Sequence, residues 1–184
     1  MNDLFISYAH IDDLPISEDQ KGWISEFHRV LQNRLAQLMG EKPKIWRDQK
    51  LSGSDIFDNE IVDQFKNTKL MVSVLSPRYI KSEWCNKEIK EFYRNAELSS
   101  GVALAGKSRV LKVVKTPYDP QDVHPELKQV FGSVLGFNFY DFDNDSGKVF
   151  EYNEAFGKEA RQNYFTRIYD LAYEICEILK KSDG

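Results

Sequence analysis

Trp84 and Glu88 lie one helical turn apart near the middle of the chain, in a segment that could position a carboxylate for chemistry. The apolar stripe of the predicted helix consists of Cys85, Ile89, Phe92 and Ala96. At about 100° per residue, Glu88 falls between this stripe and Trp84, so we expect its carboxylate at the rim of a core, beside a large aromatic face. Such a glutamate is either a partly desolvated site residue or the partner of an ion pair, and helix geometry alone leaves both interpretations open.

The length and composition favour a single domain that works in the cytoplasm. The chain has 184 residues, of which 41% are hydrophobic, enough to bury one substantial core. Its net charge of −4 argues against a protein that binds nucleic acid directly through the phosphate backbone. The first residues lack the features of a signal peptide, and no segment approaches the roughly 18 apolar residues that span a bilayer. Only Cys85 and Cys176 occur, which fits a reducing compartment, so we expect a cytoplasmic protein without membrane contact.

Short apolar runs alternate with longer segments of helical periodicity along the chain. The runs that we interpret as strands are Leu4–Ala9, Lys44–Trp46, Leu70–Leu75, Arg109–Val114 and Leu135–Asp141. The expected helices are Ile24–Leu38, Asp55–Phe65, the segment with Trp84 and Glu88, and Lys158–Lys181. We interpret Thr116–Phe131 and Phe142–Gly157 as loops that leave room for one short helix. The alternation predicts an α/β domain, with a parallel sheet and helices on both faces, joined by right-handed crossovers.

In open parallel sheets, ligands bind in the crevice beyond the carboxyl ends of the strands. Polar segments follow the first three predicted strands, at Ser7–Asp13, Arg47–Ser54 and Ser76–Glu88. Ser7 and Tyr8 could meet a ligand there, or Ser7 could cap the next turn while Tyr8 packs. The three histidines are scattered without metal-ligand spacing, and neither a G-x-x-x-x-G-K-[ST] nor a G-x-G-x-x-G motif occurs. We therefore expect no metal site and no dehydrogenase-type dinucleotide fingerprint.

Three segments resemble the Toll/interleukin-1 receptor (TIR) domain family, in particular its bacterial members. They read DLFISYAH at the first strand, IWRDQKLSGSDIFDNEI across the second strand and its loop, and VSVLSPRYIKSEWCNKEI through the third strand and the helix of Glu88. Each motif is weak alone, but their order and spacing make the combined match specific. The resemblance implies a flavodoxin-like fold with a five-stranded parallel sheet. Residues 1–141 would form the TIR core, and residues 142–184, a loop and a C-terminal helix, would complete the same domain.

The resemblance also implies an activity. TIR domains that act as enzymes cleave the nicotinamide–ribose bond of NAD⁺ with a glutamate in a motif similar to S-x-W-C-x-x-E, which here spans Ser82–Glu88. The family pattern thus nominates Glu88 as the catalytic carboxylate. The expected substrate-binding residues are Trp84, Ser7, Tyr8, Trp46, Asp48 and Ser76. NAD⁺ is the substrate in this interpretation, with no further cofactor, and the products are nicotinamide and linear or cyclic ADP-ribose.

The resemblance further implies a bacterial immune or cell-suicide effector that associates with other TIR domains, as a homo-oligomer or filament, under a fused or separate sensor. A non-catalytic TIR scaffold, in which Glu88 is structural, is the alternative, and the presence of Glu88 beside Trp84 favours the enzyme. Asp48 could orient a ribose or close its loop by an Asx turn. A phosphoacceptor receiver domain is set aside, because it needs an aspartate at the end of the third strand, where this chain has Ser76 and Pro77.

Overall fold

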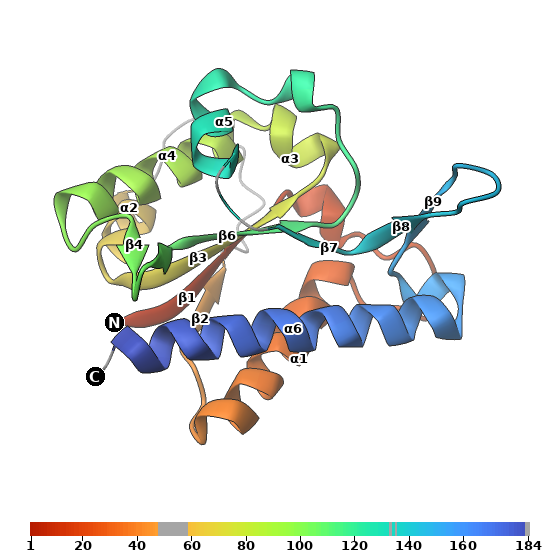
Figure 1. The fold of residues 1–184 in the computed structure, drawn as a ribbon, viewed down its shortest axis with the longest axis horizontal. Coiled ribbons are helices and arrows are strands. Elements are labelled where there is room, and N and C mark those ends of the chain that lie inside the picture. The colour runs from red at the N-terminus through yellow and green to blue at the C-terminus, as the bar shows by residue number, and fades with distance from the viewer. Residues whose placement is uncertain (48–58, 133, 135, 183–184) are drawn as a thin grey trace.

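Five parallel strands form one sheet through the middle of the molecule (Figure 1). The computed structural model describes residues 1–47, 59–132, 134 and 136–182. The strands, in their order across the sheet, are β2 (Ile45–Arg47), β1 (Asn2–Ser7), β3 (Thr68–Leu75), β6 (Val110–Val114) and β7 (Gly136–Asn138). This is the flavodoxin-like order, in which the chain changes direction across the sheet between β1 and β3. The predicted five-stranded parallel sheet is thereby confirmed.

Both faces of the sheet are buried, which explains why its strands read as continuous apolar runs. In β1, Leu4 and Ile6 point into one core, whereas Phe5 points into the other. The first core lies under α1 (Trp23–Met39) and α6 (Lys158–Ser182). The second core lies under α2 (Asn59–Lys66), α3 (Pro77–Lys81), α4 (Glu83–Leu98) and α5 (Pro125–Gly132) (Figure 1). The helices therefore cover both faces, as the alternation predicts.

The long helices begin and end close to their predicted bounds. Helix α1 ends at Gly40, whose φ of 81° places it in the left-handed region that favours glycine. Helix α6 packs against α1 and contributes buried residues such as Ile168 and Leu171 to the same core. The second predicted helix is described from Asn59 onward, so its expected start at Asp55 lies outside the described residues. The proposed boundary at residue 141 stays a prediction.

The two segments that we expected to be loops contain more regular structure than predicted. The first segment, Thr116–Phe131, holds the short helix η2 (Pro120–Asp122) and most of α5. The second segment, Phe142–Gly157, holds most of the antiparallel hairpin of β8 (Tyr140–Phe142) and β9 (Val149–Glu151). The short helix η3 (Glu154–Phe156) follows the hairpin. Asp143 closes the hairpin turn, because its Oδ1 accepts hydrogen bonds from the backbone N of Asp145 and of Ser146, at 2.9 and 2.8 Å. Arms of three residues are too short to show a strand period in the sequence.

Two further small elements complete the description. The short helix η1 (His10–Asp13) follows β1, and a two-stranded ribbon, β4 (Ala103–Leu104) with β5 (Lys107–Ser108), lies between α4 and β6. Within the described ranges, no helix combines the length and the apolar character required to cross a membrane.

Candidate active site around Glu88

Two short capping interactions direct the chain from β3 to Glu88. Ser76 Oγ accepts a hydrogen bond from the backbone N of Tyr79, at 3.1 Å, and caps α3, whose first residue is a proline. Ser82 Oγ accepts from the backbone N of Cys85, at 3.2 Å, and caps α4. The predicted apolar stripe of α4 is buried against the sheet, which turns Glu88 inward as well.

Glu88 is almost fully buried and receives hydrogen bonds on both of its carboxylate oxygens. Its exposed fraction is 3%. Trp84 Nε1 donates to Oε1, at 3.1 Å, and Ser7 Oγ donates to Oε2, at 2.5 Å. Ser7 is the last residue of β1, so its bond to Glu88 connects α4 to the carboxyl end of that strand. Both of these donors are neutral groups.

A third residue, Tyr79, extends this arrangement. Its hydroxyl lies 2.8 Å from Ser7 Oγ and is fully buried. Since the single hydroxyl proton of Ser7 is donated to Glu88, the proton between Ser7 and Tyr79 belongs to the phenol. Burial raises the pKa of Tyr79 well above its usual value, and the nearby Cys85 and Glu88 raise it further, so the phenol keeps that proton. Tyr79, Ser7 and Glu88 therefore form a chain of hydrogen bonds, here called the Tyr79–Ser7–Glu88 relay.

A second carboxylate, the half-buried Asp12, lies at the same edge of the sheet. Ser76 Oγ donates to Asp12 Oδ2, at 2.5 Å, and Ser76 is 1% exposed. Burial raises the pKa of Asp12, an effect that the hydrogen bond from Ser76 and the charge of Lys115 oppose. Ser7 and Ser76 thus stand at the carboxyl ends of the neighbouring strands β1 and β3, and each hydroxyl holds one of the two carboxylates.

The family follows from the succession of these segments along the chain. The family model described as "TIR domain" matches residues 4–150, which cover the strands and helices that carry Ser7, Trp84 and Glu88. The chain belongs to the TIR domain family. No curated protein matches it in sequence.

Two solved structures show how far the likeness extends. The TIR domain of the Toll-related receptor TRR-2 from the lower metazoan Hydra magnipapillata is 17% identical, with a TM-score of 0.43, and the match covers 74% of this chain and 85% of that chain. The TIR domains of the activated Roq1 resistosome, which directly recognizes the pathogen effector XopQ, are 18% identical, with a TM-score of 0.42, and the match covers 94% and 84%. The family assignment rests on the family model rather than on these two structures.

Three of the predicted substrate-binding residues of this TIR domain have mainly structural surroundings. Ser76 caps α3 and holds Asp12. Trp46 stacks on Phe5, with ring centroids 4.7 Å apart, at the border of the core. Tyr8 is 8% exposed, and its backbone carbonyl accepts a hydrogen bond from Cys85 Sγ, at 3.7 Å. Asp48 lies outside the described residues, as does most of its loop, so its role stays a prediction.

Sequence reasoning missed Tyr79 and Asp12 as members of the site. Asp12 lies in a polar segment after the first strand, which was a signal for it, but its pairing with Ser76 depends on the packing of two distant segments. Tyr79 follows Pro77 in a stretch that looks like ordinary core. Cys85 belongs to the apolar stripe of α4, and burial together with the charge of Glu88 raises the pKa of its thiol, which disfavours the reactive thiolate.

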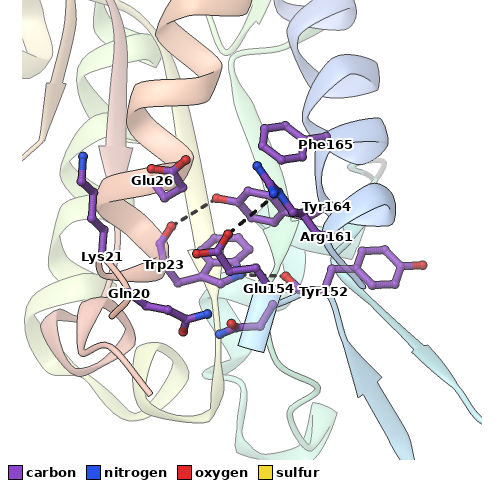
Figure 2. A pocket seen from close by; sticks show the side chains of 10 residues that line it. Gln20, Lys21, Trp23, Glu26, Tyr152, Glu154, Arg161, Tyr164 and Phe165 are labelled. Atoms are coloured by element: carbon purple, nitrogen blue, oxygen red, sulfur yellow. Dashed lines mark hydrogen bonds and ion pairs between the residues drawn. The ribbon is translucent and has the colours of Figure 1, made fainter. Parts of the chain in front are cut away.

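The opposite face of the sheet carries a small pocket between α1 and α6 (Figure 2). Its volume is about 30 Å³, which is room for one or two water molecules. Trp23 Nε1 donates to the carbonyl of Tyr152, at 3.1 Å, and the hydroxyl of Tyr164 donates to the carbonyl of Trp23, at 3.3 Å. These bonds satisfy polar atoms of the aromatic residues that line the pocket. The pocket is also too small to hold a dinucleotide.

Proposed function

We propose that this TIR domain is an NAD⁺ nucleosidase in which Glu88 is the catalytic carboxylate. The observation that supports the proposal is the setting of Glu88, which is 3% exposed and bonded to Ser7 at the carboxyl end of β1. Ligands of flavodoxin-like folds bind in the crevice at this edge, where the strand order reverses. A carboxylate held there in a low-dielectric setting exerts a stronger field on a developing positive charge than one in water.

One carboxylate suffices for this reaction. Glycosidases generally need a second carboxyl group to protonate a leaving alcohol, whereas nicotinamide leaves a cationic pyridinium as a neutral molecule. The electron pair of the bond between the ribose carbon and the ring nitrogen departs with nicotinamide, and the ribose becomes an oxocarbenium ion. Glu88 stabilises this cation by its charge. Attack by water with loss of a proton gives ADP-ribose, and attack by a nitrogen of the adenine ring gives a cyclic product.

The neighbouring side chains fix the carboxylate for that task. The Tyr79–Ser7–Glu88 relay holds Oε2, and the indole N–H of Trp84 holds Oε1. Fixed hydrogen bonds keep a charged group in place without reorganisation during the reaction, which is the basis of electrostatic catalysis. Trp84 is part-buried, and its ring face is suited to stack on the cationic nicotinamide ring.

The proposal extends to the biological role that the family resemblance implies. The domain would act as a bacterial immune or cell-suicide effector in the cytoplasm. It would associate with copies of itself or other TIR domains and respond to a fused or separate sensor.

A non-catalytic TIR scaffold is the second candidate, and one observation favours it. The hydrogen bond from Ser7 joins Glu88 of α4 to β1, and the one from Trp84 lies within α4, which is also what a purely structural buried glutamate would show. The two candidates differ in whether the negative charge of Glu88 matters for turnover.

The deciding experiment compares Glu88→Gln with Glu83→Gln. Both glutamates lie on α4, but Glu83 is exposed and makes a matched control. We expect wild type to release nicotinamide from NAD⁺, followed by chromatography, and Glu88→Gln to be slower by about 100-fold or more. Glu83→Gln should retain the wild-type rate, and thermal unfolding should show that both variants are folded. Equal rates for wild type and Glu88→Gln would contradict the catalytic role, and absence of turnover in wild type at all protein concentrations would favour the scaffold.

A further inference from the structure

A second, larger hollow lies at the edge of the sheet, beside β7. Its volume is about 660 Å³, within the range of roughly 300–1,000 Å³ that is typical of small-molecule sites. Lys112 and Val114 of β6 and Asn138 of β7 form its floor, because Val114 pairs with Asn138 in the parallel register. Residues of α5, of η2 and of the start of the β8–β9 hairpin complete its lining. None of the residues of the Tyr79–Ser7–Glu88 relay lines this hollow, so it is distinct from the candidate active site.

Aromatic side chains form much of the wall. They are Tyr118, Phe131, Tyr140 and Phe142. The rings of Tyr140 and Phe142 meet edge to face, with centroids 5.6 Å apart, and Phe142 is 58% exposed although it is a large apolar residue. Burial and the neighbouring Tyr140 raise the pKa of Tyr118, so its phenol is neutral at physiological pH. Uncharged aromatic faces of this kind are suited to pack against a planar ring.

The polar side chains that line the hollow carry a net positive charge, although the protein as a whole is acidic. Lys112 and Lys128 line the hollow, and the described residues around it include no carboxylate, although the whole chain has a net charge of −4. The acidic residues of the same segments bond elsewhere: Asp122 pairs with Lys81 at 3.3 Å, Glu126 pairs with Lys90, and Asp141 accepts from the hydroxyl of Tyr152. The hollow therefore offers two cations to a ligand without a competing internal anion.

Lys112 has the setting of a binding residue rather than a surface lysine. It is half-buried, and no hydrogen bond or ion pair of its ammonium group is found within the part of the chain that the structure describes. Its side chain lies across Gly136 of β7, because a Cβ atom at position 136 would be only 2.7 Å from Lys112 Cε. A glycine at this position thus lets the ammonium group reach the floor of the hollow. A partly desolvated ammonium group gains more from an anionic partner than a fully hydrated one.

We propose that this hollow binds a small ligand that combines a planar heteroaromatic ring with one anionic group, a mononucleotide being the size that fits. The ring would pack among Tyr118, Tyr140 and Phe142, and the phosphate or carboxylate would bind Lys112 and Lys128. The proposal does not depend on NAD⁺ cleavage, because it uses neither Glu88 nor its partners.

Four probes separate the contributions of ring and charge. AMP carries a ring and a phosphate, nicotinate a ring and a carboxylate, adenosine a ring alone, and inorganic phosphate an anion alone. We expect AMP, measured by calorimetry and by backbone amide shifts at Gly132 and Asn138, to bind at least tenfold more tightly than adenosine or phosphate. The affinity of nicotinate relative to AMP tells whether a carboxylate can replace the phosphate. The same measurement on Glu88→Gln should give unchanged affinity, which distinguishes this site from the catalytic crevice.

Three variants test the named residues. Lys112→Gln should weaken AMP binding about tenfold, since a charge-assisted hydrogen bond is lost, whereas Lys148→Gln, on the exposed hairpin away from the hollow, should not. Gly136→Ala keeps the charge but displaces the Lys112 side chain, so it should weaken the binding of AMP as well. Phe142→Ala removes an exposed ring and should weaken the binding of AMP more than the binding of phosphate. Equal affinities of AMP and adenosine, or an unchanged affinity in folded Lys112→Gln or Gly136→Ala protein, would overturn the proposal, as would no binding of AMP at millimolar concentration.

Discussion

At the scale of single residues, the candidate site depends most on the hydroxyl of Ser7. It accepts from Tyr79 and donates to Glu88, and the exposed fraction of Ser7 is 1%. A buried polar group that loses its partner costs free energy, because water cannot replace the bond. The hydroxyl of Ser7 therefore links the stability of the core to the orientation of the carboxylate.

We predict different losses of stability for the middle residue of the relay, Ser7, and for its outer donor, Tyr79. Ser7→Ala leaves both the Tyr79 hydroxyl and Glu88 Oε2 without this partner, so the free energy of unfolding should fall by about 1–3 kcal/mol. Tyr79→Phe removes only the outer donor and should cost about 1 kcal/mol. Urea denaturation gives both values. A larger loss for Tyr79→Phe than for Ser7→Ala would contradict the order of the bonds. In the enzyme interpretation, turnover should fall more in Ser7→Ala, because Glu88 loses a direct contact.

The raised pKa of Asp12 gives a prediction for stability against pH. Burial makes the folded protein bind a proton at Asp12 more tightly than the unfolded chain, whose carboxyl titrates near 3.8. The ionised form is thus unfavourable in the fold. Its cost is absent below about pH 3.8 and appears as pH rises through the raised folded-state pKa.

The comparison that isolates this effect is Asp12→Asn against wild type. The asparagine carbonyl can still accept from Ser76 but carries no charge, so the variant should gain stability relative to wild type between pH 4 and neutral pH. Chemical denaturation at several pH values measures the difference. A difference in unfolding free energy that is constant over this range would show that Asp12 does not titrate as described.

At the scale of elements, two successive helix caps set the direction of α4. Ser76 caps α3 and Ser82 caps α4, with only five helical residues between them. An error in either cap would rotate the start of α4, and both Trp84 and Glu88 lie in its first two turns. The site therefore relies on local turn chemistry as well as on core packing.

We expect Ser82→Ala to lower the free energy of unfolding by about 1 kcal/mol, the usual cost of losing an N-cap. Its turnover should fall by more than this loss of stability accounts for, because Glu88 moves with the helix. Ser17→Ala, which changes an exposed serine outside any helix, is the control. Circular dichroism and nicotinamide release report the two effects. A variant with full activity and lower stability would indicate that the cap does not position Glu88.

The sequence was informative where periodicity and burial coincide. Strand β1 and helices α1 and α4 have apolar patterns that are long enough to recognise in the sequence. These patterns predict the parallel sheet, the crevice at its edge and the side of α4 on which Glu88 lies. The hairpin of β8 and β9 was missed because its arms have three residues each. The contacts of Asp12 with Ser76 and of Ser7 with Tyr79 join positions 64 and 72 residues apart, so no local pattern encodes them.

At the scale of the whole molecule, the association implied by the family resemblance gives a prediction about activity. A neighbouring copy that closes the crevice over a long dinucleotide would exclude water and strengthen the field of Glu88. Specific activity should therefore rise with protein concentration, together with the mass measured by light scattering. A crowding agent should have the same effect at low concentration. Constant specific activity over about a hundredfold dilution, with a monomeric mass throughout, would show that one chain contains the complete site.

The two ends of the described chain meet the sheet at the edge opposite to Glu88. Asp3, at the start of β1, bonds with Lys44, and Lys180, near the end of α6, donates to the carbonyl of Leu38, at the end of α1. Glu88 instead contacts Ser7, four residues after Asp3 along β1, which is about 13 Å at the usual rise per residue. A purification tag, a fluorescent label or another domain joined to either end would attach at the edge of the sheet opposite to the crevice. It would reach the crevice directly only through a long linker. A signal from such an attachment would otherwise have to travel through the strands or through contacts between copies.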